Sequence, residues 1–171
     1  MSLKPEISAK DHIQGNENSS VTIVEFGDYQ CPHCGAAYPI IKEIQDAFGD
    51  QVSFVFRNFP LSESHQYATI AAQAAEAAAI QGKFWEMHDA IYEQQHNLDE
   101  DFLIKLSKEL GLDADQFKQD LAADTVKEKV ENDFESGIRS GVNGTPTFFV
   151  NGERFDGGAT DLYEMLKESA E

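Results

Sequence analysis

Apolar residues fill positions 21–26 without alternating with polar ones, in the order Val-Thr-Ile-Val-Glu-Phe. Because a strand covered on both faces has no solvent side, this pattern predicts a central β-strand. From Pro32 the apolar positions follow a helical spacing that ends at Gly49, and residues 52–57 form a second strand-like run. These elements predict a β-α-β unit with parallel strands, whose strand-to-helix turn lies at the carboxyl edge of the sheet, where sites commonly form.

The next part of the chain, residues 62–141, has helical patterns and no strand pattern. Its first segment has eight alanines between Ala68 and Ala79, and such small side chains favour close helix packing. Asp99 and Asp113 each precede an amphipathic stretch and are predicted to cap a helix. A capping-box pattern from Thr125 to Glu128 predicts the start of a last helix with apolar positions four residues apart: Val126, Val130, Phe134 and Ile138.

Strand patterns return at residues 147–150, and Asn151-Gly152 then predicts a two-residue hairpin turn before a partner strand ending at Phe155. A helical pattern closes the chain, and residues 1–20 are expected to be an irregular lead-in or a weak edge strand. The order βαβ, helices, ββα predicts an α/β fold with an all-α insertion between the second and third main strands. We assign residues 1–61 and 142–171 to a discontinuous sheet-containing domain and 62–141 to a helical insertion domain.

The formal net charge of -18 excludes some classes of partner. A negative field repels phosphate backbones and anionic lipid surfaces, so we do not expect nucleic-acid binding. No run of apolar residues approaches the length needed to cross a bilayer, so we do not expect membrane insertion. The polar segment from Met1 to Asn18 has no apolar signal core, which favours a cytoplasmic location for the chain as printed. A bacterial periplasmic or other extracytoplasmic location is the alternative if a signal segment has been removed.

The two cysteines of the chain are three positions apart, in the sequence Cys31-Pro32-His33-Cys34, directly after the first predicted strand. A cysteine at a helix N-terminus faces unpaired backbone N–H groups, which favour the thiolate and lower its pKa. Pro32 suits the first helical position, and His33 would favour the thiolate further when protonated. Cys34, one turn later, is placed to close a short disulfide with Cys31, so we predict a redox-active pair that needs no other cofactor.

Metal binding and inert thiols are the alternatives for this pair. A zinc site needs two further ligands, and none occurs nearby at finger-like spacing, so no metal site is predicted. Gly35 after Cys34 excludes the haem-attachment pattern, which requires His at that position.

Two motifs, Glu25-Phe-Gly-Asp-Tyr-Gln-Cys31-Pro-His-Cys34 and Gly144-Thr-Pro-Thr-Phe-Phe-Val150, make the chain resemble the DsbA family of thioredoxin-fold proteins. The resemblance implies a thioredoxin-like fold with a helical insertion, Cys31 as the attacking cysteine and Cys34 as the resolving one. It also implies that Pro146 follows a cis peptide bond beside the dithiol and that the backbone at Thr145 binds extended substrate segments. An ordinary trans proline at the start of a strand is the alternative.

Glu25 is the one ionisable residue in the strand that precedes the cysteines. Burial would raise its pKa and allow it to relay the proton of Cys34, which is a hypothesis, and a salt bridge with a basic residue such as Arg57 is the alternative. Pro39 and Thr145 depart from the best-known DsbA pattern, so the direction of electron flow stays open. Pro39 is also expected to kink its helix.

Several other residues are expected to have structural roles. Phe84, His88, Ile91 and Tyr92 share one helical face, on which His88 is interpreted as a core histidine rather than a ligand. Trp85 and Phe84 are interpreted as packing residues rather than a peptide-binding patch. Asp28 and Tyr29 lie in the turn before Cys31, and bordering the substrate groove is an even alternative to a purely local role.

We therefore predict a protein thiol-disulfide oxidoreductase that exchanges its dithiol with protein or peptide thiols and disulfides and is recycled by an unidentified redox partner. Stabilisation of the Cys31 thiolate favours an oxidase over a reductase. A non-catalytic peptide- or metal-binding module on the same fold is the main alternative. A glutathione-dependent transferase is a further one, which the presence of two cysteines disfavours.

Overall fold

The computed structural model describes residues 1–170. The chain forms two compact units. Unit 1 comprises residues 1–27, 32–57 and 136–171, and unit 2 comprises residues 28–31 and 58–135. One boundary between them therefore falls immediately before the first residue of the predicted active-site helix.

A five-stranded mixed sheet organises unit 1. Its strands are β1 (His12–Gly15), β2 (Val21–Gly27), β3 (Val52–Asn58), β4 (Thr147–Val150) and β5 (Glu153–Phe155), in the spatial order β1-β3-β2-β4-β5. β4 is antiparallel to β2 and β5, and β1 is antiparallel to β3. Residues 1–20, which were expected to be either an irregular lead-in or a weak edge strand, thus contain the short edge strand β1.

The strands predicted to be covered on both faces are buried. Every residue of β3 and the last five residues of β2 are buried, and the register places Val24 opposite Phe149 and Phe26 opposite Thr147. Asn151 and Gly152 connect β4 to β5 with φ values of 50° and 85°, the left-handed conformation that a two-residue hairpin turn requires. The α/β thioredoxin-like fold is therefore confirmed.

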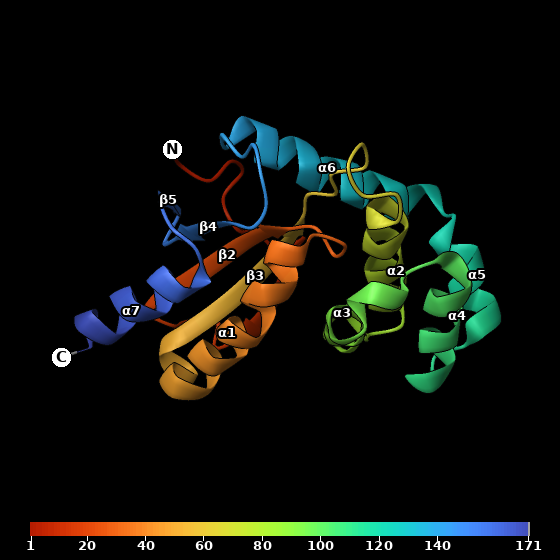
Figure 1. Cartoon of the computed structure of the whole chain (residues 1–171), viewed down its shortest axis with the longest axis horizontal. Coiled ribbons are helices and arrows are strands. Elements are labelled where there is room, and N and C mark those ends of the chain that lie inside the picture. The colour runs from red at the N-terminus through yellow and green to blue at the C-terminus, as the bar shows by residue number, and fades with distance from the viewer. Residues whose placement is uncertain (171) are drawn as a thin grey trace. The chain divides into compact units, whose positions relative to one another are not determined.

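Unit 1 also contains the helices α1 (Pro32–Phe48) and α7 (Ala159–Ser169), which pack against each other beside the sheet (Figure 1). The rings of Phe48 and Tyr163 meet edge to face, with centroids 6.2 Å apart. A 3₁₀ turn, η1 (Gly49–Gln51), joins α1 to β3. Pro39 lies inside α1, as expected, and the helix runs through it to Phe48. The kink at Pro39 stays a prediction.

Unit 2 is helical, with α2 (Ala68–Ile80), α3 (Phe84–Glu93), the 3₁₀ turn η2 (Gln95–Asn97), α4 (Glu100–Glu109), α5 (Ala114–Leu121) and most of α6 (Asp124–Arg139) (Figure 1). Helix α2 contacts α3, α4 and α5. Seven of its alanines are buried, because small side chains let several neighbours approach one helix closely. The predicted caps are confirmed, since the Asp99 and Asp113 side chains accept hydrogen bonds from Phe102 N and Gln116 N. None of the helices formed by residues 1–170 has the length and apolar character to span a bilayer.

The last helix of the block differs from the prediction at both ends. Helix α6 begins at Asp124, with Lys127 N already bonded to Ala123 O, so Thr125 lies inside the helix rather than at its cap. Ile138 is 56% exposed although Val126 and Val130 are buried. A four-residue spacing drifts by about 40° per step on an α-helix, so after three steps the position has left the buried face. Asp133, Ser136 and Ser140 occupy that face instead.

Candidate functional site

The predicted nucleophile lies at the junction between a buried turn and a helix. Cys31 directly precedes α1, which begins at Pro32 and contains Cys34 in its first turn. The first turn of α1 contains no acidic side chain, so no carboxylate there opposes a thiolate at the helix start. His33 is exposed beside it.

The two cysteines differ in exposure. Cys31 retains 5% of its accessible surface, whereas Cys34 retains none, and no disulfide joins them in this structure. Both cysteines are thus buried, and Cys31 is the one of the two that keeps a small exposed surface. This order agrees with the roles that the family resemblance implies for the pair.

Asp28 organises the turn that leads to Cys31. Its side chain is fully buried, and its Oδ1 accepts a hydrogen bond from Gln30 N at 2.8 Å. Its Oδ2 accepts from Leu61 N at 3.0 Å and from His65 Nδ1 at 2.7 Å. Cys31 N donates to Asp28 O at 3.0 Å, which closes the turn. The Asp28 side chain thus holds the turn to the loop between β3 and α2, and its place at the border of a substrate groove stays a prediction.

Tyr29 packs into the aromatic face of α3. Its hydroxyl lies 2.9 Å from His88 Nδ1, and its ring centroid lies 4.9 Å from that of Tyr92. His88 is 3% exposed and meets Trp85 edge to face. The interpretation of His88 as a core histidine is confirmed. Phe84 is 5% exposed and packs as interpreted, whereas Trp85 is half-buried, and its packing role stays a prediction.

The other two residues of the turn are bound to separate elements of unit 2. Gln30 Oε1 accepts a hydrogen bond from Tyr67 N at 2.7 Å, just before α2. Gln95 Nε2, in η2, donates to Tyr29 O at 2.9 Å and to Cys31 O at 2.7 Å. Sequence reasoning missed Gln95 and His65. The one local signal was Asp28 two residues before Gln30, the spacing of an Asx-turn.

Glu25 lies on β2 opposite Phe148 and is 3% exposed, so it is buried as expected. Arg57, the cation considered as its partner, instead forms a two-pronged pair with Asp11, with Nε–Oδ1 and NH2–Oδ2 distances of 2.8 and 2.9 Å. The same guanidinium donates to Ser136 Oγ at 2.8 Å. The Arg57 charge is thus neutralised within unit 1 by Asp11.

The second motif forms the entry to β4. The peptide bond between Thr145 and Pro146 is cis, and both residues are half-buried. Thr147 Oγ1 donates to Gly144 O at 2.7 Å and thereby holds the turn around the proline. Strand β4 begins directly afterwards, at Thr147.

A second polar cluster lies inside unit 2, away from the sequence motifs. Asn58 Nδ2 donates to Glu76 Oε2 and to Asp133 Oδ2, both at 2.9 Å, and Lys129 Nζ lies 2.7 Å from Asp133 Oδ1. Burial raises the pKa of Asp133, against the opposing effect of Lys129. These contacts tie the end of β3 to α2 and α6.

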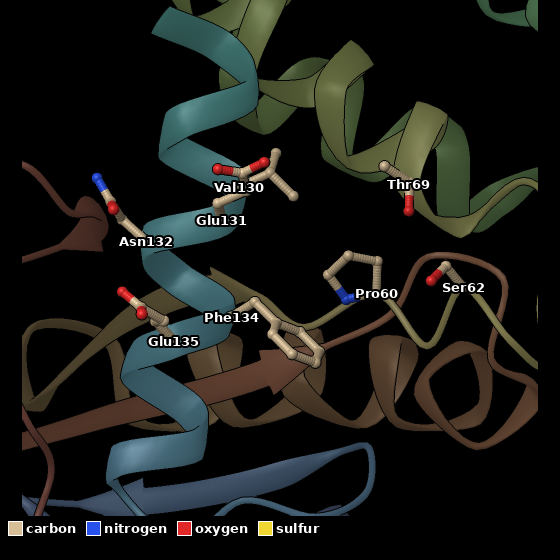
Figure 2. A pocket seen from close by; sticks show the side chains of 8 residues that line it. All are labelled: Pro60, Ser62, Thr69, Val130, Glu131, Asn132, Phe134 and Glu135. Atoms are coloured by element: carbon tan, nitrogen blue, oxygen red, sulfur yellow. The ribbon is translucent and has the colours of Figure 1, made fainter. Parts of the chain in front are cut away.

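A pocket of about 460 Å³ opens next to this cluster, between α6, the start of α2 and the loop at residues 60–62 (Figure 2). Phe134 and Pro60 form part of its apolar lining, and Glu131 and Glu135 lie on the α6 side. Phe134 stacks on Phe59, with ring centroids 4.4 Å apart. None of the predicted site residues lines this pocket.

Curated relatives match most of this chain with a small part of their own length. An Na(+)/H(+) antiporter NhaA 1 of Salinispora arenicola is 43% identical over 148 residues, which are 86% of this chain and 22% of that protein. An NhaA of Herminiimonas arsenicoxydans is 41% identical over 158 residues, or 92% of this chain and 25% of that protein. The chain thus spans a quarter or less of the length of these relatives.

Solved structures match the chain over nearly its whole length. A thioredoxin-like oxidoreductase from Silicibacter pomeroyi is 28% identical with a TM-score of 0.80, covering 95% of this chain and 94% of that one. BdbD from Bacillus subtilis is 28% identical with a TM-score of 0.81, over 94% of this chain and 90% of its own. The thiol-disulfide exchange protein α-DsbA2 from Wolbachia pipientis has the same identity and a TM-score of 0.82, over 94% and 86%.

A family model described as Thioredoxin matches residues 8–168, which include both motifs and the whole helical unit. The fold, the Cys-Pro-His-Cys segment at the start of α1 and these similarities agree. The chain therefore belongs to the thioredoxin family, as a DsbA-like member.

Proposed function

We propose that this protein is a thiol-disulfide oxidoreductase that oxidises the thiols of protein substrates to disulfides, or rearranges existing disulfides, through Cys31 and Cys34. The observation that carries the proposal is the pair of cysteines at the start of α1, of which Cys31 keeps 5% of its surface exposed and Cys34 none. The names of two similar structures, a thioredoxin-like oxidoreductase and a thiol-disulfide exchange protein, support the same reaction.

The start of α1 supplies the driving force for a reactive thiolate. The first N–H groups of a helix have no acceptor within it, so they stabilise an anion that lies at the helix start. Pro32 at the first position has no N–H to offer, which leaves the groups of His33 and Cys34 closest to Cys31 in the sequence. His33 adds positive charge when protonated.

In the oxidising direction, a substrate thiolate attacks Cys31 Sγ of the Cys31–Cys34 disulfide. A bond forms between the substrate sulfur and Cys31, and Cys34 leaves as a thiolate. A second substrate thiolate then attacks the first substrate sulfur and releases Cys31. The substrate loses two electrons and gains a disulfide, and the protein gains the two electrons as a dithiol. A redox partner with a group that accepts two electrons, such as a disulfide, must then reoxidise the pair.

Two further groups are assigned roles in this reaction. Glu25, buried on β2, donates a proton to Cys34 after it leaves as a thiolate, and accepts that proton when Cys34 becomes the attacking group, directly or through water. The extended backbone at Thr145, before Pro146, pairs with the main chain of the substrate and so accepts varied sequences. Client proteins would then be selected by an exposed cysteine in an extended segment rather than by one side chain.

Trapping a mixed disulfide tests the proposal. The Cys34→Ser variant, mixed with reduced and unfolded ribonuclease A in the presence of oxidised glutathione, should accumulate a covalent adduct at Cys31. The matched Cys31→Ser variant should form none, although Cys34 remains. If neither variant forms an adduct and the native protein neither reactivates ribonuclease nor reduces insulin, the enzymatic proposal is wrong.

The equilibrium constant with glutathione decides the direction of electron flow. A thiolate stabilised at the helix start makes the disulfide form oxidising, so we expect the pair to be reduced by glutathione more readily than a structural disulfide. A pair that stays oxidised in excess reduced glutathione would identify a reductase-type poise instead.

A further inference from the structure

The turn at residues 28–31, which ends at the predicted nucleophile Cys31, is bound by several residues of the helical unit. Asp28 binds the loop before α2, Tyr29 packs on α3, and Gln30 binds Tyr67 N. The carbonyl of Cys31 is bound by Gln95 from η2. This segment, residues 28–31, belongs to unit 2 although the helix that follows it belongs to unit 1.

Gln95 makes the contact closest to the reacting atom. Its Nε2 donates to Cys31 O at 2.7 Å and to Tyr29 O at 2.9 Å, and its side chain is half-buried. A primary amide has two N–H donors, so these two carbonyls use its whole donor capacity. The contact spans 64 residues of sequence, between the turn and the end of α3.

Both backbone polar groups of Cys31 are therefore engaged within unit 2. Its N–H donates to Asp28 O at 3.0 Å, and its carbonyl accepts from Gln95. The direction of a side chain follows from the orientation of the two peptide units that flank its Cα. These bonds consequently orient both peptide units of Cys31 and so direct its side chain, and the stability of a thiolate that precedes a helix depends on that direction.

We propose that Gln95 is a positioning residue for Cys31, which keeps the nucleophile aligned with the start of α1 and thereby lowers the free energy of its thiolate. The biological purpose of this role rests on the proposed dithiol exchange, whereas its test by alkylation of Cys31 does not. Gln95 also places the positive end of its amide dipole on the Cys31 carbonyl, which reduces the negative potential near the sulfur.

A purely structural strap is the competing interpretation of Gln95. It predicts a loss of stability on substitution, with an unchanged pH profile of Cys31. A positioning role predicts that the profile moves even where stability does not. The apparent pKa of Cys31 is therefore the discriminating readout.

The test uses the full chain with Cys34→Ser, so that Cys31 is the single thiol. Gln95→Met keeps the length of the side chain and removes both donors, whereas Gln95→Glu keeps its shape and faces the two carbonyls with acceptors. Gln94→Met is the matched control, because Gln94 is the exposed neighbour. The rate of alkylation by iodoacetamide is measured from pH 4 to 10, together with thermal unfolding.

Other titrating groups near the turn are common to all variants. They are Asp28 and His65 in their mutual pair, His33 on α1, and His88, Tyr29 and Tyr92 in the aromatic cluster. Because each is present in every protein compared, their titration does not produce a difference between Gln94→Met and Gln95→Met.

We expect the apparent pKa of Cys31 to rise in Gln95→Met by an amount that lowers the thiolate fraction at neutral pH about two- to tenfold, the worth of one or two hydrogen bonds. Gln95→Glu should lower the thiolate fraction further, and Gln94→Met should have the same apparent pKa of Cys31 as the parent. With Cys34 restored, the exchange constant with glutathione should shift toward the disulfide form by a similar factor.

Profiles of Gln95→Met and Gln95→Glu that overlie the parent would overturn the positioning role, whatever their melting temperatures. If Gln95→Met fails to fold, the uncharged Gln95→Leu variant against Gln94→Leu decides the same question. Failure of the proposed function gives a different result: the native protein would not exchange disulfides, while the alkylation profiles would still rank the variants.

Discussion

The carboxylate of Asp28 should be among the most sensitive side chains of the helical unit. It is 1% exposed and accepts three hydrogen bonds, from Gln30 N, Leu61 N and His65 Nδ1, at 2.8, 3.0 and 2.7 Å. The Asp28→Ala variant removes all three acceptors at once. Each buried donor left without an acceptor costs about 1–3 kcal/mol.

The lower end of that range applies to each donor of this set. Gln30, Leu61 and His65 are only half-buried, so water recovers part of each lost bond. With about 1 kcal/mol for each of the three donors, Asp28→Ala should lower the free energy of unfolding by about 3 kcal/mol. Asp28→Asn keeps one acceptor oxygen and turns an NH2 group toward at least one donor, so about 1–2 kcal/mol is expected.

Urea unfolding followed by the fluorescence of Trp85 measures this loss. Trp85 is the single tryptophan of the chain and lies in the same unit, against His88. Glu63→Ala is the matched control, because Glu63 is an exposed acid in the loop that Asp28 holds. The reasoning fails if Asp28→Ala and Glu63→Ala unfold at urea midpoints that differ by less than the equivalent of about 1 kcal/mol.

Three further predictions follow from single positions. Gly27→Ala should destabilise the protein by about 1–3 kcal/mol in the same urea assay, because a Cβ there overlaps the Phe56 ring and lies 2.7 Å from Glu25 Oε2. Glu25→Gln, with both cysteines present, should slow the step that depends on Cys34, measured as the rate at which Cys34 resolves a mixed disulfide between Cys31 and glutathione, and leave alkylation of Cys31 unchanged; equal slowing of both would refute the relay. Asp133→Asn should cost most near pH 4 and less as the pH rises, because an acid whose pKa is raised by folding stabilises the folded state only while it is protonated; a cost that grows with pH would contradict this.

Local sequence patterns determined much of the fold and the identity of the dithiol. The apolar run at 21–26, the helix from Pro32 and the Asn151-Gly152 turn each act within a few residues, so their conformations follow from neighbours in the chain. The helix caps at Asp99 and Asp113 are equally local. Two cysteines one turn apart at a helix start are a local arrangement as well.

Periodicity alone did not predict which residues of α6 are buried or where that helix begins, because both depend on the packing around the helix. The four-residue spacing predicted Ile138 to be buried, but the buried face of α6 follows a period of about 3.6 residues, and that difference accumulates along a long helix. Thr125 was an acceptable cap by its side chain, yet the helix had already started at Asp124. Helix ends are set by the contacts of the whole turn rather than by one residue.

Only the tertiary structure could reveal how the nucleophile is held. Asp28 meets His65 across 37 positions and Gln95 meets Cys31 across 64, in stretches where a polar residue is ordinary. Nothing near Gln95 in the chain distinguishes it from the exposed Gln94. A side chain that donates to a distant backbone carbonyl leaves no periodic pattern, because its partner offers the same carbonyl whatever its residue type. The sequence thus determined the reactive group, and the packing of the helices decided which residues hold it in place.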